Sequence, residues 1–108
     1  MPAFDVTPGE AIRYLAETDE QEAQARTQME YFDHKIKEAK AEAYLKAVGS
    51  VDERKSTAEI DATVIELKEY YMAEMTIQRK LYNERKTCEL IIAMWQTKSA
   101  NSRRGNIT

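Results

Sequence analysis

The sequence contains little of what disulfide-stabilised, secreted or membrane-spanning proteins require. Cys88 is the only cysteine, so no internal disulfide can form, and a lone thiol is typical of a reducing compartment. No run of about 18 apolar residues occurs, which argues against a membrane-spanning helix. The first ten residues, MPAFDVTPGE, lack the apolar segment of a secretory signal. We therefore expect a cytoplasmic protein that makes no contact with a membrane.

Residues that break helices or form turns are also scarce. The 108 residues include three glycines and two prolines, and 32% of the residues are charged. No stretch alternates apolar and polar residues with an enrichment in β-branched side chains, as a half-buried strand would. This composition predicts an all-α protein with long helices and few turns.

The side chains that usually carry catalysis or bind metals are few. His34 is the only histidine, and although Glu30 lies four residues before it, one such pair does not make a carboxylate-bridged metal site. Cys88 has no histidine close in sequence to act as a base, so a buried thiol is the simpler interpretation. Glycine-rich phosphate loops and paired-cysteine metal motifs are absent. We expect no enzyme activity, no catalytic residues, no metal and no cofactor.

Two long helices are predicted, and capping residues mark their boundaries. Thr7 precedes Pro8, with Glu10 three residues after the threonine, which is the pattern of a helix start. The first helix is expected over about residues 8–48, and the polar stretch TDEQE (18–22) leaves open whether it is continuous.

A short connector follows at about residues 49–61, where Gly49 suits a helix end and Ser50 with Glu53 forms a second capping box. The second helix is expected over about 62–99, followed by a basic tail at 100–108. We treat the whole chain, 1–108, as one helical domain.

The second helix carries a stripe at heptad spacing, interrupted by two polar residues. Gln78 and Arg85 occupy stripe positions, which would be unfavourable in a strict two-stranded coiled coil. The stripe consists of Val64, Leu67, Tyr71, Met75, Gln78, Leu81, Arg85, Cys88, Ile92 and Trp95. Two long helices with a short connection predict a coiled-coil-like antiparallel hairpin. Because the aromatic residues cover more than one face, we expect the hairpins to assemble into a helical homo-oligomer.

Charge is distributed unevenly along the chain. Residues 1–33 hold eight acidic and two basic side chains, whereas residues 79–108 hold seven basic and two acidic ones, although the whole chain carries −3. Basic side chains follow phosphates, and an aromatic ring among them can stack on a base. The candidate residues for contact with single-stranded nucleic acid are Arg54, Lys55, Arg79, Tyr82, Lys86, Lys98, Arg103 and Arg104.

Two motifs carry a resemblance to a known family. The connector GSVDERK (49–55) and the ending WQTKSANSR (95–103) flank a long helix, and over residues 44–106 the chain resembles the UvsY-type recombination mediators of tailed bacteriophages. The resemblance implies an oligomer in the host-cell cytoplasm that binds single-stranded DNA. It also implies that the protein helps to load a recombinase onto DNA covered by a single-strand-binding protein.

Two other classes of function remain open. The acidic amino-terminal face could be the working surface of a protein-binding helical module, such as a phage-encoded inhibitor or adaptor of a host or phage protein. Alternatively, the chain could be a structural coiled-coil subunit of a larger particle, for which its length and apolar stripe would matter more than its charge.

Overall fold

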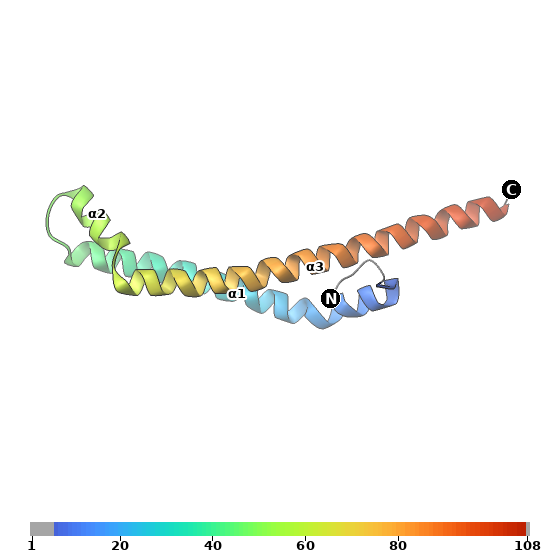
Figure 1. The fold of residues 1–108 in the computed structure, drawn as a ribbon, viewed down its shortest axis with the longest axis horizontal. Helices are drawn as coiled ribbons and strands as arrows, with labels where there is room; N and C mark the ends of the chain where they lie inside the picture. The colour runs from blue at the N-terminus through green and yellow to red at the C-terminus, as the bar shows by residue number, and fades with distance from the viewer. Residues whose placement is uncertain (1–5, 108) are drawn as a thin grey trace. The chain divides into compact units, whose positions relative to one another are not determined.

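The computed structural model describes residues 6–107 and is all-α, as predicted. Three helices follow one another: α1 (Pro8–Lys46), α2 (Val51–Glu59) and α3 (Ala62–Ile107). The long helices α1 and α3 pack antiparallel, and the short α2 connects them (Figure 1). None of the described helices combines the length and hydropathy that crossing a membrane requires.

The capping residues lie where the sequence predicts them. Thr7 Oγ1 accepts a hydrogen bond of 3.2 Å from the backbone N–H of Glu10 at the start of α1. At the start of α2, Ser50 Oγ accepts one of 3.2 Å from the N–H of Glu53. Gly49 has a φ of 115°, which side-chain-bearing residues rarely adopt, so the glycine permits the turn between the two helices.

The first helix is continuous through Thr18–Glu22, the polar stretch that the sequence left undecided. It ends at Lys46, slightly before the predicted end near residue 48. Thr18 is buried, and its hydroxyl donates to the carbonyl of Tyr14 at 2.7 Å. A threonine that bonds back to its own helix in this way keeps its hydroxyl satisfied without breaking the helix.

The second long helix begins as predicted but ends later. Asp61 Oδ1 caps its start by accepting hydrogen bonds from the N–H groups of Thr63 (3.0 Å) and Val64 (3.2 Å). The helix continues past Ser99 to Ile107, so the basic residues predicted to lie in a tail are on helical backbone instead. No proline interrupts residues 100–107, and a polar composition alone does not end a helix.

The chain packs as two compact units, to both of which α1 and α3 contribute. The terminal unit joins the chain up to Glu22 with the chain from Arg79 onward, and the connector unit is Ala23–Gln78. In the connector unit, the fully buried Val64 and the buried Ala25, Ile36 and Ala58 form the core. Small residues at such positions let helices approach closely.

Electrostatic contacts fix α2 within the connector unit. Glu59, at the end of α2, forms ion pairs of 2.9 Å with Lys40 of α1 and 2.9 Å with Lys68 of α3. The hydrogen bonds from Lys68 and then Lys40 lower the pKa of Glu59 to about 2. The Glu59 carboxylate thus ties the connector helix to both long helices.

The core of the terminal unit contains a polar layer at Arg85, the position expected to be unfavourable. One guanidinium nitrogen donates to the Leu15 carbonyl and to Thr18 Oγ1, both at 2.8 Å, and the other lies 2.5 Å from the Asp19 carboxylate. The Arg85 side chain is only 18% exposed. Buried Leu81 and Cys88 pack on either side of it along α3. The polar residue is therefore accommodated because both terminal guanidinium nitrogens find acceptors on α1.

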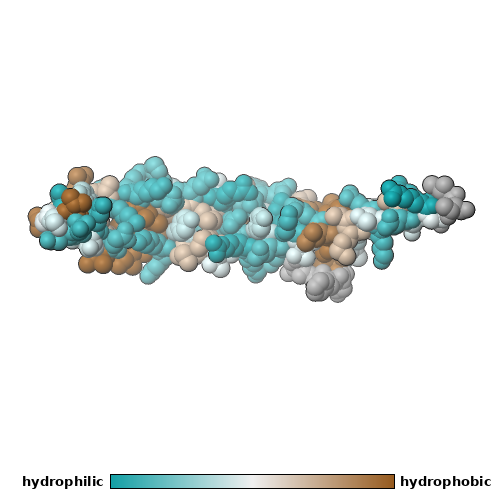
Figure 2. Space-filling view, turned by 90° about the horizontal axis from the view of Figure 1, so that it is seen from above, coloured by the Kyte–Doolittle hydropathy of each residue, from teal (hydrophilic) through white to brown (hydrophobic). Residues whose placement is uncertain are grey.

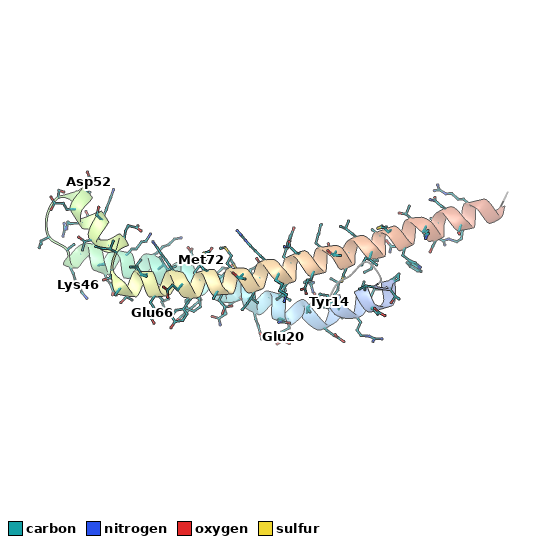
Figure 3. All side chains as sticks on the ribbon, in the orientation of Figure 1. Tyr14, Glu20, Lys46, Asp52, Glu66 and Met72 are labelled. Carbon is teal, nitrogen blue, oxygen red and sulfur yellow. The ribbon has the colours of Figure 1, made fainter. Side chains whose placement is uncertain are left out.

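Tyr14 lies beside this layer and faces α3, where its hydroxyl donates to the Glu84 carboxylate (Figure 3). Burial, followed by the hydrogen bond to Glu84, raises the pKa of Tyr14 from 10.0 to about 12. Because the folded state holds this proton more tightly, the stability that Tyr14 contributes is present below pH 10 and is lost as the pH rises toward 12.

We therefore propose to titrate the wild type and Tyr14→Phe to alkaline pH and to follow the ultraviolet absorbance of tyrosine. The difference between the two curves is expected to show one phenol that ionises near pH 12. A difference curve centred near pH 10 would mean that Tyr14 is solvated and not bonded to Glu84.

Candidate nucleic-acid interface

The predicted nucleic-acid-binding residues fall in both units. Arg54 and Lys55 lie on α2 in the connector unit. The other six lie on α3 in the terminal unit: Arg79, Tyr82, Lys86, Lys98, Arg103 and Arg104. Some of these eight side chains make contacts within the fold, and the others face solvent.

Arg54 has a structural role in the connector. Its guanidinium lies 4.9 Å from the centre of the Tyr44 ring, and its Nε donates to the Ala47 carbonyl at 3.1 Å. These contacts join α2 to the end of α1, which leaves Arg54 half-buried. Lys55 next to it is exposed. Of the two connector candidates, Lys55 is the one directed to solvent.

Three α3 residues form a compact exposed cluster, named here the aromatic cluster: Arg79, Tyr82 and Lys86. Their spacing of three and four residues places them on one side of the helix. The Tyr82 ring is 55% exposed. Lys86 lies 3.6 Å from Glu89 in an exposed ion pair, which is weak enough for a phosphate to displace. The aromatic cluster therefore offers a ring between two cations.

The remaining three candidates form the basic end of α3: Lys98, Arg103 and Arg104. All are exposed. The red end of α3 continues past the start of α1 in the terminal unit (Figure 1). About five turns separate Lys86 from Arg104, so both lie on the same side of the helix. Within one chain, however, they are about 27 Å apart along its axis, at 1.5 Å per residue.

The terminal unit presents opposite charges on its two helices. The α1 segment carries exposed Glu10, Glu17 and Glu20, and Glu20 lies on the side of α1 away from α3 (Figure 3). Asp19 is neutralised by Arg85. A polyanion would thus be attracted to α3 and repelled from the outer side of α1.

An apolar surface on α3 was not predicted from the sequence. An open groove on the helix is lined by Leu90, Ala93, Met94, Trp95, Thr97, Lys98 and Asn101. Leu90 is 56% exposed and Met94 is 71% exposed. The signal was present in the sequence, because Leu90, Met94, Thr97 and Asn101 are spaced by four, three and four residues.

Cys88 and His34, the two side chains that the sequence singles out for reactive or metal chemistry, lie in different environments. Cys88 is buried, and its burial, followed by the charge of Glu84, raises the pKa of its thiol, which disfavours a nucleophilic thiolate. Among residues 6–107, no group of three or more histidine, cysteine, aspartate or glutamate side chains could hold a metal ion. His34 is exposed and pairs with Glu38 at 3.3 Å.

Comparison with known proteins identifies no relative. No protein-family model, no curated protein and no solved structure matches this chain.

Proposed function

We propose that this protein is a non-enzymatic recombination or replication accessory protein of a bacteriophage, which binds single-stranded DNA and helps to load a recombinase. The observation that carries the proposal is the exposed series of basic residues on α3, which lie one turn before and one turn after Tyr82 and continue to Arg104.

The chemistry of a single strand fits this surface. Arg79 and Lys86 can follow phosphates while Tyr82 stacks on an unpaired base, a mode of binding that tolerates any sequence. Arg104 extends the cationic side of the helix, and Lys98 and Arg103, about 100° to 120° around the helix from it, add further phosphate contacts. An accessory protein of this kind needs several weak strand-binding sites on one assembly and no catalytic group.

The acidic side of α1 supports a role with protein partners. Glu10, Glu17 and Glu20 would keep DNA off that surface and leave it free for a recombinase or a single-strand-binding protein. One assembly could thus hold a strand on α3 and a protein on α1.

The proposal predicts binding to a fluorescent oligonucleotide that weakens steeply with salt. Changing Arg103 and Arg104 to alanine is expected to lower the affinity about tenfold at low salt and to reduce the salt slope by about 1.4, because each phosphate contact contributes about 0.7 on a single strand. Fluorescence anisotropy across salt concentrations measures both quantities.

A matched control removes two cations elsewhere. Lys37 and Lys46 are exposed on α1 in the connector unit, so Lys37→Ala with Lys46→Ala changes the net charge equally and should leave the salt slope unchanged. An equal loss of affinity in both double variants would mean that the overall charge, and not contacts by Arg103 and Arg104, causes the effect. No binding even at low salt would reject the proposed function.

A second candidate function is supported by another surface. Four large apolar residues around the connector are strongly exposed, namely Leu45, Val48, Val51 and Ile60. Brown side chains gather at this end in the hydropathy view (Figure 2). Apolar patches of this kind mark protein-binding sites, so failure to bind oligonucleotides would favour a protein-binding adaptor or inhibitor.

A further inference from the structure

Trp95 ends the heptad stripe of α3 with a ring that half faces solvent. Leu81 is 7% exposed and Cys88 is fully buried, but Trp95, seven residues after Cys88, is 52% exposed. Seven residues are close to two helical turns, so the three side chains lie on the same side of α3. In the terminal unit, α3 continues past the start of α1 (Figure 1). The side of α3 that is buried at Cys88 is therefore accessible at Trp95.

Two exposed cations lie on opposite sides of Trp95. Lys98 follows Trp95 by three positions, about 60° around the helix, and Arg103 follows it by eight positions, about 80° around in the other direction. No aspartate or glutamate occurs from Leu90 to the end of the chain. The part of α3 that carries Trp95 therefore has only positive charges, which attract an anion.

The groove that Trp95 helps to line also contains polar side chains. Thr97, Lys98 and Asn101 line it together with apolar residues. An anionic membrane would attract the same cations, but a helix that lies on a membrane needs a continuous apolar face, which Thr97 and Asn101 interrupt. A nucleotide of a single strand presents a flat base beside a charged phosphate, and a ring next to cations fits both parts.

We infer that Trp95 stacks on an unpaired base of single-stranded DNA, while Lys98 and Arg103 contact the phosphates on either side of that nucleotide. The inference deepens the proposed function and rests on it. Stacking on an aromatic ring tolerates any sequence, because every base has a π-face. Trp95 thereby joins the strand-binding residues that basic side chains alone had identified on this end of α3.

Trp95 is a stacking position separate from Tyr82. Thirteen residues separate the two rings, which corresponds to about 20 Å along the helix axis and about 140° around it. A strand that stacks on both rings must therefore pass partly around α3. Two such positions hold the strand in a path that phosphate contacts along one side of the helix would not define.

The fluorescence of the protein reports directly on this contact, because Trp95 is the only tryptophan in the chain. Titration with oligothymidylate at low salt is expected to quench the fluorescence and to shield the indole from acrylamide, since a stacked base covers it. An abasic oligonucleotide of the same length has the phosphates but no bases, and it should leave the fluorescence unchanged. Equal quenching by both oligonucleotides would overturn the inference.

Substitutions of Trp95 separate stacking from apolar packing. Trp95→Phe keeps a ring and is expected to bind a labelled oligonucleotide within about threefold of the wild-type affinity. Trp95→Leu keeps an apolar side chain without a ring and is expected to lower the affinity about fivefold or more. Fluorescence anisotropy measures both variants, and circular dichroism should show both to be helical. Wild-type affinity in Trp95→Leu would reject the stacking role.

Met72→Ala is the matched control for the loss of an exposed apolar side chain. Met72 is 54% exposed on the same helix but lies in the connector unit, away from the basic end of α3. This variant should bind the oligonucleotide as tightly as the wild type does. Equal losses of affinity in Met72→Ala and Trp95→Leu would mean that exposed apolar surface, and not stacking, causes the effect.

The outcomes also separate the inference from the proposed function. If the labelled oligonucleotide binds and the fluorescence of Trp95 does not change, the proposed function stands and the inference is rejected. If no oligonucleotide binds even at low salt, both are rejected. Vesicles that contain phosphatidylglycerol are the remaining arm. A blue shift of the Trp95 emission with vesicles, and no change with oligothymidylate, would assign the ring to a membrane surface and overturn the inference.

Discussion

Replacing Arg85 with alanine is expected to lower the free energy of unfolding by about 2 to 3 kcal/mol. The substitution removes the hydrogen bonds to Leu15 and Thr18 and the ion pair with Asp19, and it leaves a void beside buried Thr18. Asp19 is 69% exposed and can be rehydrated, so the loss of stability should be smaller than when a fully buried ion pair is broken.

Arg85→Leu is expected to behave differently. Leucine fills the same layer between Leu81 and Cys88. The Leu15 carbonyl and the Thr18 hydroxyl keep hydrogen bonds within α1, and the exposed Asp19 carboxylate is hydrated. Replacing a buried polar contact by an apolar side chain of suitable volume is often neutral or stabilising. The leucine variant should therefore match or exceed the stability of the wild type.

Urea denaturation followed by circular dichroism measures both variants at the same protein concentration. If leucine destabilises as much as alanine, the specific hydrogen bonds rather than the packing hold this layer. If alanine matches the wild type, Arg85 contributes nothing to stability.

The Gly49→Ala substitution is expected to lower the free energy of unfolding by about 2 kcal/mol. At a φ of 115°, an L-residue is strained whatever space surrounds it. An added Cβ would also overlap the carboxylate of Glu53 and lie 3.2 Å from the Cβ of that residue. The Glu53 carboxylate can move away from the added Cβ, so most of the cost comes from the strained φ.

Gly9 provides the matched control for this substitution. A Cβ at Gly9 would meet nothing within 4 Å, and Gly9 lies in the first turn of α1. Gly9→Ala should therefore leave the stability unchanged or raise it, because alanine favours the helix. Equal thermal unfolding midpoints for Gly9→Ala and Gly49→Ala would contradict the strained turn.

Local signals made most of the fold predictable. Thr7 and Ser50 cap helices through contacts with residues three positions later, and the positive φ that Gly49 permits is a local property. The predicted end of α3, near Ser99, was wrong, because α3 continues to Ile107. The residues after Ser99 are polar, but no proline among them ends the helix.

Contacts between distant segments could not be read from the sequence. The stripe identified Arg85 as a polar seam residue, but its acceptors Leu15 and Thr18 lie on the other helix. Likewise, the sequence did not show that Arg54 lies against Tyr44 and Ala47 of the preceding helix end. The sequence identified the cations, and only the packing showed which of them face solvent.

The Arg85 layer also restricts how the two long helices can slide past each other. A slip of one heptad in the terminal unit would move Thr18 away and bring Ala11 opposite the guanidinium, where no side-chain acceptor is available. Apolar layers tolerate such slips far better, because one aliphatic contact resembles the next. The polar contacts of Arg85 therefore select one alignment of the two helices among several that would bury similar apolar surface. Hairpins that form early in folding with another alignment would be short-lived.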